Sequence, residues 1–379
     1  MAFDIKIGTK DSLDDIESQV RQLLQKPSPA TQFRSIVSSD RRGCFFKDIW
    51  GSIAVATGVE RSNDSEVIAW GLQNWEQLED EEGFALSYPS LIALQREARV
   101  VTDSVPIDLD AALVKRRLIE VGGILGTGAR QRTIVELDPD LPMAARLTSG
   151  ARRRDAFFEF ARTVLAQLQI GALARKHEST STRESGAKGT ILEFLYELHT
   201  NAFEHGRTES NVRTLRLQKH QYPHRRGAQH RASAFNELAR YIETQPERPS
   251  NRVFNLVEAS VSDYGPGILD GFLNTFAGSR HRNRSRRELL DALLHDQLSS
   301  KSSDPNAGLG IIQALTAARD IDAFVSLRTA EFWLTMQGRL GEQAQLAFRA
   351  GEFPKIVGTH WQLLLPDPTD VDRLGTSSA

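Results

Sequence analysis

The sequence predicts an α+β protein in which helices pack on one face of a partly antiparallel, mixed sheet. Residues 189–366 alternate between helix-like and strand-like stretches, and the last part of that region holds several strands in succession. The chain has 379 residues, of which 40% are hydrophobic and 25% charged. These values are ordinary for a globular protein, and the length allows two or three domains.

Residues 1–150 are expected to form a separate mixed α/β domain, to which no motif assigns a role. Residues 12–24 have the spacing of an amphipathic helix, and residues 66–78 are a second candidate helix. The Asp- and Pro-rich segment 138–142 predicts a loop and a domain boundary. Short apolar runs predict strands in this domain at 51–57, 99–102 and 132–137.

A connecting helix and loop at 151–188 is expected to lead into a second domain at 189–366. Its predicted helices are 189–205, 232–243, 286–298 and 308–319, and its predicted strands are 212–218, 253–261, 323–328, 331–336, 345–348 and 360–365. The polar, basic segment 220–251 reads as an insertion between two strands. The small, polar segment 299–306 has the composition of a lid, and 367–379 that of a loose tail.

The composition favours a cytoplasmic protein without a membrane span. Cys44 is the only cysteine, so no intramolecular disulfide can form. No apolar run approaches the ~20 residues of a membrane helix, and the N-terminus has no apolar signal region. The basic segments 207–252 and 280–287 could meet phosphate or an acidic partner, or could be solvated loops. Few aromatic residues accompany them, so nucleic acid is the less expected partner.

The first motif places three polar side chains on one face of a predicted helix. Glu197, Asn201 and His205 are four residues apart, so they share a face. Asn201 offers a carbonyl oxygen of the kind that Mg²⁺ accepts. Glu197 could take a proton from, or orient, a water that attacks a γ-phosphate. The alternative is an amphipathic helix whose polar stripe faces solvent.

The second motif is Asp263-Tyr-Gly265-Pro-Gly267, which follows a predicted strand. A carboxylate there could accept a hydrogen bond from the exocyclic amine of adenine, whereas guanine presents a carbonyl and would be rejected. Gly265 and Gly267 permit positive φ or the close approach of a ligand. The alternative is an ordinary Asp-Gly turn at the end of a strand.

The third and fourth motifs add glycines and a hydroxyl. Gly308 and Gly310 open a predicted helix, whose N-terminal N–H groups and dipole attract phosphate. Lys301, in the polar segment before it, could add a positive charge or could be a solvated loop lysine. Thr359 begins the last strand and could support the Asp263 carboxylate, although a β-branched residue is common in any strand.

Together the four segments resemble the N-box and glycine boxes of the GHKL ATPases, which include gyrase, heat-shock chaperones, histidine kinases and mismatch-repair ATPases. The stretch 201–206 is most similar to the histidine-kinase and anti-sigma serine-kinase branch. The resemblance covers 189–366 and implies a Bergerat-type α/β sandwich, with helices over one face of a mixed sheet. It implies binding of ATP and Mg²⁺, with Asn201 as metal ligand and Glu197 as the catalytic carboxylate, which activates or orients water or serves as a nucleophile in transfer. The implied nucleotide-binding residues are Asn201, Asp263, Gly265, Gly267, Lys301, Gly308, Gly310 and Thr359.

The resemblance implies an ATP-binding, slowly hydrolysing switch that signals through the lid at 299–306 to a partner protein or to residues 1–150. Two alternatives remain open: a protein serine kinase of the anti-sigma type, and a non-catalytic nucleotide sensor or scaffold. His177-Glu178 is the only pair similar to a phosphoacceptor box, and it lies too near Glu197 for autophosphorylation on a separate helical hairpin. Homodimerisation is also left open.

Overall fold

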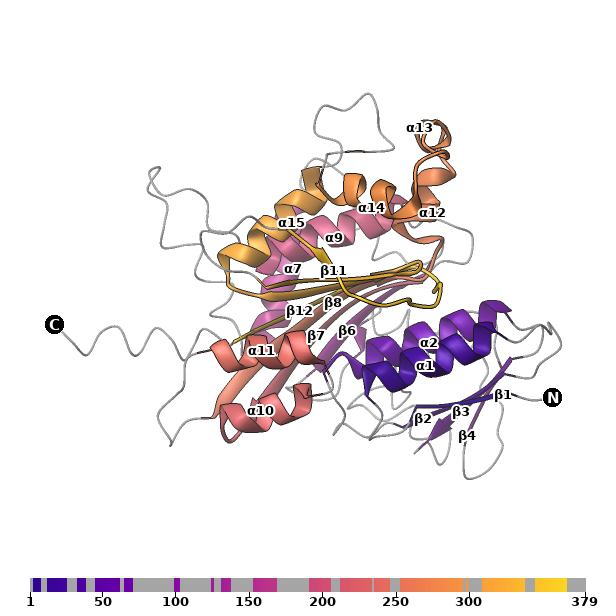
Figure 1. Ribbon diagram of the computed structural model, residues 1–379. Helices are drawn as coiled ribbons and strands as arrows, with labels where there is room; N and C mark the ends of the chain where they lie inside the picture. The colour runs from indigo at the N-terminus through magenta and orange to yellow at the C-terminus, as the bar shows by residue number, and fades with distance from the viewer. Residues whose placement is uncertain are drawn as a thin grey trace.

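The computed structural model describes residues 3–7, 12–25, 33–38, 45–61, 65–70, 99–102, 124–125, 131–137, 153–168, 191–205, 212–233, 235–245, 253–295, 298, 309–337 and 345–366. These residues form two sheets with helices between and above them (Figure 1). The α+β class expected from the sequence is therefore confirmed.

The smaller sheet is parallel, with four strands in the order β1-β2-β3-β4. The larger sheet has eight strands in the order β11-β10-β9-β12-β8-β7-β6-β5, and every neighbouring pair in it is antiparallel, so the expectation of a mixed sheet is wrong for this sheet. The strands are β1 Phe3–Ile7, β2 Phe33–Ser38, β3 Ser65–Trp70, β4 Arg99–Thr102, β5 Ile124–Leu125, β6 Gln131–Leu137, β7 Val212–Tyr222, β8 Phe254–Asp263, β9 Phe324–Thr329, β10 Phe332–Gln337, β11 Ala347–Phe348 and β12 Thr359–Pro366.

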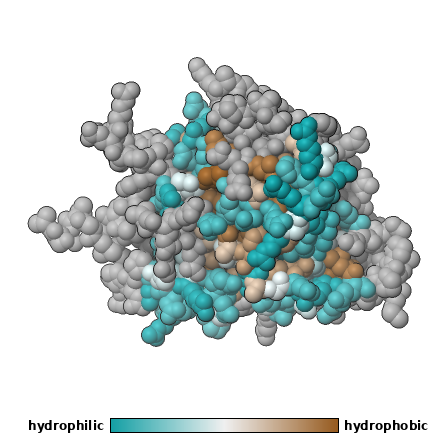
Figure 2. Space-filling model, turned by 45° about the horizontal axis from the view of Figure 1, so that its top comes forward, coloured by the Kyte–Doolittle hydropathy of each residue, from teal (hydrophilic) through white to brown (hydrophobic). Residues whose placement is uncertain are grey.

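Helices cover both faces of the larger sheet, rather than one face as expected. One core joins the sheet to α7, α9, α12, α14 and α15, and a second joins it to α1, α2, α10 and α11. On the side of the helices in the first core, hydrophobic residues lie between hydrophilic ones at the surface (Figure 2). The helices are α1 Leu13–Leu24, α2 Lys47–Arg61, α7 Arg153–Gln167, α9 Ile191–His205, α10 Arg225–Ala232, α11 Asn236–Thr244, α12 Gly267–Leu273, α13 Phe276–Ser279, α14 Arg286–His295 and α15 Leu309–Asp320.

The N-terminal helices explain why the second face is covered. α1 and α2 lie between the small parallel sheet and the large sheet, so they present apolar side chains to the latter (Figure 1). The insertion between β7 and β8 forms α10 and α11, which contribute to the same core. Two helices form there instead of the one predicted at 232–243, because α10 ends at Ala232 and α11 begins at Asn236.

The large sheet also crosses the boundary that the sequence places near residue 150. β6 pairs with β7 along its length, from Gln131↔Gln218 to Leu137↔Val212, and β5 pairs with β6. Strands from the first 150 residues therefore extend the sheet that carries the predicted motifs.

Two predictions in the N-terminal region are wrong. The run 51–57 belongs to helix α2 and not to a strand. Residues 51–58 are all buried, so no amphipathic spacing distinguished a buried helix from a buried strand. Residues 65–70 form strand β3 in place of the start of a helix at 66–78. The strands predicted at 99–102 and 132–137 are confirmed as β4 and β6.

The helices that carry the first and third motifs are confirmed as α9 and α15. The helix predicted at 12–24 is confirmed as α1, which begins with a capping box between Ser12 and Asp15. Helices α12 and α13 were not predicted from the sequence. Among the described residues, no helix combines the length and the apolarity needed to cross a bilayer.

Candidate functional site

The first and third motifs meet where α15 begins beside α9. A Cβ atom added to Gly310 would lie 3.0 Å from Glu197 Oε2 and 3.1 Å from Asn201 Nδ2. Such distances are tighter than ordinary contacts, so the start of α15 approaches both side chains as closely as glycine allows. The two polar residues that share one face of α9 are thus brought to a helix N-terminus.

The Asn201 side chain has a polar atom available for a ligand. Its Nδ2 atom is buried and has no hydrogen-bond partner among the described residues. Buried polar atoms are usually paired, so this atom has hydrogen-bonding capacity left for a water or a ligand. Rotating the amide by half a turn would present its oxygen instead, which is the atom that Mg²⁺ would accept.

The second and fourth motifs meet at the ends of β8 and β12. Asp263 and Thr359 are directly opposite each other across this pair of strands. Gly267 and Gly358 both have positive φ, +76° and +84°. A Cβ atom on Gly267 would lie 2.7 Å from the Gly358 carbonyl oxygen, and one on Gly358 would lie 1.9 Å from that of Asp263. Only glycine allows the two turns to touch in this way.

Thr359 connects the two turns by hydrogen bonds. Its hydroxyl oxygen accepts a hydrogen bond of 2.7 Å from the backbone N–H of Ile268, and its side chain also hydrogen-bonds the Asp263 carboxylate. Thr329, at the end of β9, donates from its hydroxyl to the Gly358 carbonyl at 3.0 Å. The support for Asp263 that the sequence suggested for Thr359 is therefore present in the structure.

Burial raises the pKa of the Asp263 carboxyl from 3.8 to about 6. The hydrogen bonds from the Gly265 N–H and from Thr359, together with the charge of Arg213, act in the opposite direction but do not cancel the desolvation. A buried carboxylate with little solvation would gain from a ligand that donates a hydrogen bond to it. The exocyclic amine of adenine is such a donor.

The structure places six of the nine predicted site residues beside one another in two groups. Glu197, Asn201 and Gly310 form one group, and Asp263, Gly267 and Thr359 form the other. Gly265 lies between Asp263 and Gly267 in sequence, and its backbone N–H donates to Asp263 Oδ1 at 3.1 Å. Helix α12, which begins at Gly267, packs against α9, so the groups are neighbours. Lys301, Gly308, the 299–306 lid and the side chain of His205 lie outside the described residues.

Two residues of the site were missed by sequence reasoning. Arg213 is buried and faces Asp263 from β7, and its charge lowers the carboxyl pKa. The Thr329 hydroxyl bonds the Gly358 carbonyl, and its oxygen would lie 3.2 Å from a Cβ atom on Gly267. Neither belongs to a recognisable motif, and only the pairing of β7, β8, β9 and β12 brings them to the site.

The basic segment 280–287 separates into structural and exposed residues. Arg286 bridges Asp270 and Glu331 at 2.7 and 2.5 Å, and the Arg287 guanidinium lies 4.4 Å from the Phe348 ring centroid. Arg282 and Arg284 are exposed. The run thus partly connects α12 and α14 to the turn between β9 and β10, and does not by itself indicate an anionic partner.

Comparisons of the chain with family models, with curated proteins and with solved structures gave no match.

Proposed function

We propose that this protein is a Mg²⁺-dependent ATP-binding switch that hydrolyses ATP slowly. The observation that carries the proposal is the contact of Gly310 with both Glu197 and Asn201, at 3.0 and 3.1 Å from the position of a Cβ. It supports a site at which the N-terminus of α15 faces phosphate beside an acid and an amide. The resemblance of the four motifs to the GHKL ATPases points to the same ligand.

Each residue has a distinct role in this proposal. Asp263 accepts the adenine amine, and Thr359 holds the carboxylate in place. Asn201 binds Mg²⁺ through its amide oxygen, and the metal, when bound, neutralises the phosphate charge. Glu197 orients the water that attacks the γ-phosphate. Gly310 lets the N-terminus of α15 lie directly beside Glu197 and Asn201, so that its N–H groups face the phosphates.

The test is a calorimetric titration of the full chain with ATP and Mg²⁺, with phosphate release followed in parallel. Glu197→Ala should keep ATP affinity and lose turnover. Asn201→Ala should weaken binding much more with Mg²⁺ present than in EDTA. Glu193→Ala, one turn earlier on α9, is the matched control because Glu193 pairs with Arg154 at the surface.

Four outcomes would contradict the proposal or part of it. Absence of ATP binding by the wild-type chain removes the proposal altogether. Equal losses for Asn201→Ala with and without Mg²⁺ remove the metal role. Unchanged turnover in Glu197→Ala removes the water-orienting role, and label from γ-³²P-ATP appearing on a protein serine would replace hydrolysis by phosphotransfer.

A further inference from the structure

In the strands that end at the candidate site, neighbouring residues point their side chains to opposite faces of the sheet. Side chains alternate between the two faces of a sheet. On β8 and β12, Val261 and Trp361 belong to the core beneath α9 and α15. Asp263 and Thr359 lie two residues away on the same strands, so they share that face of the sheet. Tyr264 belongs to the other core, with α1 and α2. Each turn of the site is thus backed by the N-terminal helices.

Helix α2 is joined to the Asp263 turn by a buried chain of hydroxyl groups. The Ser52 and Tyr264 hydroxyl oxygens are 2.5 Å apart, and both residues are almost fully buried. Ser52 donates its single proton to the Ile49 carbonyl at 2.7 Å, so Tyr264 must donate to Ser52. The residue next to Asp263 is therefore held in place by α2.

The same helix reaches the Gly358 turn. The backbone N–H of Val357 donates to Thr57 Oγ1 at 3.3 Å, and the Val357 carbonyl accepts from His360 Nε2 at 2.8 Å. The His360 ring meets the Tyr264 ring edge-on at 4.9 Å between centroids, so the two turns also touch each other on this side. Ser52 and Thr57 are both buried on one helix, five positions apart in sequence, and contact one turn each.

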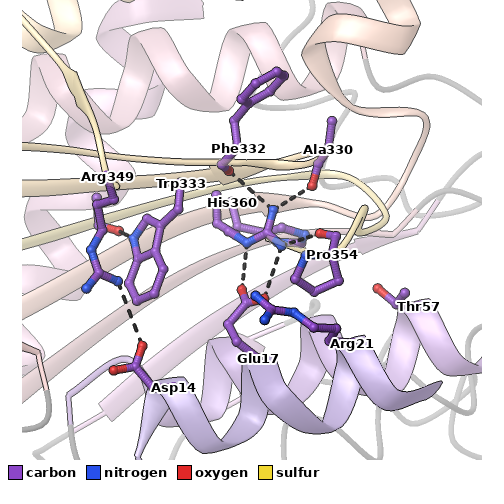
Figure 3. A network of polar contacts seen from close by, with 12 residues as sticks. Asp14, Glu17, Arg21, Thr57, Ala330, Phe332, Trp333, Arg349, Pro354 and His360 are labelled. Atoms are coloured by element: carbon purple, nitrogen blue, oxygen red, sulfur yellow. Dashed lines mark hydrogen bonds and ion pairs between the residues drawn. The ribbon is translucent and has the colours of Figure 1, made fainter. Parts of the chain in front are cut away.

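Helix α1 holds the segment that leads into the Gly358 turn. Arg328 Nε donates to Glu17 Oε1 at 2.6 Å, and a second nitrogen of the same guanidinium donates to the Pro354 carbonyl at 2.5 Å (Figure 3). Arg21 of α1 donates to the Glu352 carbonyl. Arg328 directly precedes Thr329, whose hydroxyl bonds Gly358 on the opposite face. Both N-terminal helices therefore contact the backbone behind the site.

From these contacts we propose that Ser52 and Thr57 are positioning residues for the nucleotide site. Ser52 acts through Tyr264 on the Asp263 turn, and Thr57 acts through Val357 on the Gly358 turn. The occupancy of the site and the packing of α2 are then energetically coupled, so α2 is the element through which the N-terminal region senses or adjusts nucleotide binding. This inference rests on the proposed function, because its ligand is ATP.

The first test uses variants that change only the hydroxyl group. Thr57→Val keeps the shape of the side chain, and Thr57→Ser keeps the hydrogen bond. We expect Thr57→Val to weaken ATP binding by about twofold to tenfold in calorimetry, which corresponds to the loss of one hydrogen bond. Thr57→Ser should restore wild-type affinity. Thr244→Val, in α11, is the matched control, because its hydroxyl bonds the Tyr241 carbonyl within the same helix.

The second test asks whether Ser52 and Tyr264 act as one unit. Ser52→Ala and Tyr264→Phe should each lower the affinity for ATP. The double variant should bind ATP no more weakly than whichever single variant has the lower affinity. Tyr264→Phe also keeps the inference testable if a substitution in α2 prevents folding. By reciprocity, saturating ATP should slow hydrogen exchange of the α2 amides between residues 49 and 57.

The outcomes separate this inference from the proposed function. If the wild-type chain binds ATP while Thr57→Val and Tyr264→Phe bind it equally well, the positioning role is wrong and the ATP site stands. If all variants lose thermal stability with unchanged affinity, the contacts are structural only, and the inference is again wrong. If the wild-type chain does not bind ATP, both proposals are wrong.

Discussion

The Thr359 hydroxyl holds the Asp263 carboxylate from the opposite strand, while it accepts the backbone N–H of Ile268 at 2.7 Å. One side chain of β12 thereby fixes the carboxylate and the start of α12 together. Ionisation of this carboxyl nevertheless costs free energy, because burial raises its pKa to about 6. A buried carboxyl with a raised pKa does not stabilise the apo protein at neutral pH. Such groups are typical of sites that bind a ligand.

Asp263→Asn should stabilise the apo protein at neutral pH and not in acid. The folded pKa lies above the unfolded value of 3.8, so the contribution of Asp263 to stability is fully present below pH 3.8 and is lost as the pH rises through about 6. We expect the gain from the substitution to be larger at pH 7 than at pH 4, by on the order of 2–3 kcal/mol. Urea unfolding at both pH values measures it.

Comparing the variant with the wild type at each pH removes the effect of other titrating groups. An equal gain at the two pH values would show that the Asp263 carboxyl titrates normally. The same variant should lose ATP binding in calorimetry at pH 7 if the carboxylate reads adenine.

Gly310→Ala should weaken ATP binding by about tenfold or more without unfolding the protein. Its Cβ would lie 3.0 Å from Glu197 Oε2, and side-chain ends of this kind can move away. Alanine also favours a helix over glycine by up to about 1 kcal/mol, so thermal stability should be kept or raised. Gly227→Ala in α10 is the control, because its nearest neighbours lie at 3.6 Å, an ordinary contact.

The result is informative because stability and binding are expected to change in opposite directions. Gly310→Ala with wild-type ATP affinity would mean that ligand binding does not depend on the close approach of α15 to Glu197 and Asn201. Gly227→Ala should preserve affinity in either case.

Gly358→Ala should destabilise the protein more than Gly351→Ala. Both glycines have positive φ, and an alanine in such a conformation costs about 1–3 kcal/mol. At Gly358 the added Cβ would also lie 1.9 Å from the Asp263 carbonyl oxygen, whereas at Gly351 its nearest contact is the Phe353 ring at 3.7 Å. Backbone cannot move away as a side chain can, so the excess cost measures how tightly the two turns are joined. Chemical unfolding of the two variants gives this difference directly, and similar losses would contradict it.

The sequence predicted the helices and strands that carry the motifs because their apolar spacing is regular. The strand expected at 253–261 is β8, which ends at Asp263, and Gly310 stands at the start of α15, as expected. The motifs are brought together by the pairing of strands that lie far apart in the sequence. Thr329 reaches the site only because β9 pairs with β12, and nothing near it in the chain signals this.

The N-terminal layer could not be predicted for a related reason. Helix α2 is buried on all sides over residues 51–58, so its sequence lacks the polar face that identifies most helices. The contact of α1 with the large sheet also includes a buried ion pair, between Glu17 of α1 and Arg328 of β9. Such residues read as surface positions in a sequence, and the loop-like segment 138–142 favoured an independent N-terminal domain over helices packed on the second face.

Glu17→Ala should lower the free energy of unfolding by about 3–5 kcal/mol, because it leaves the Arg328 charge buried without its carboxylate. Arg328 is fully buried, and its guanidinium donates to both Glu17 oxygens, at 2.6 and 3.2 Å. Arg154→Ala is the control: Arg154 is 52% exposed in its pair with Glu193, so the loss should stay within about 1 kcal/mol. Urea unfolding at pH 7 compares the two. A loss for Glu17→Ala no larger than for Arg154→Ala would mean that α1 is not fastened to the sheet by this pair, and that the backbone behind Gly358 is held by Arg328 alone.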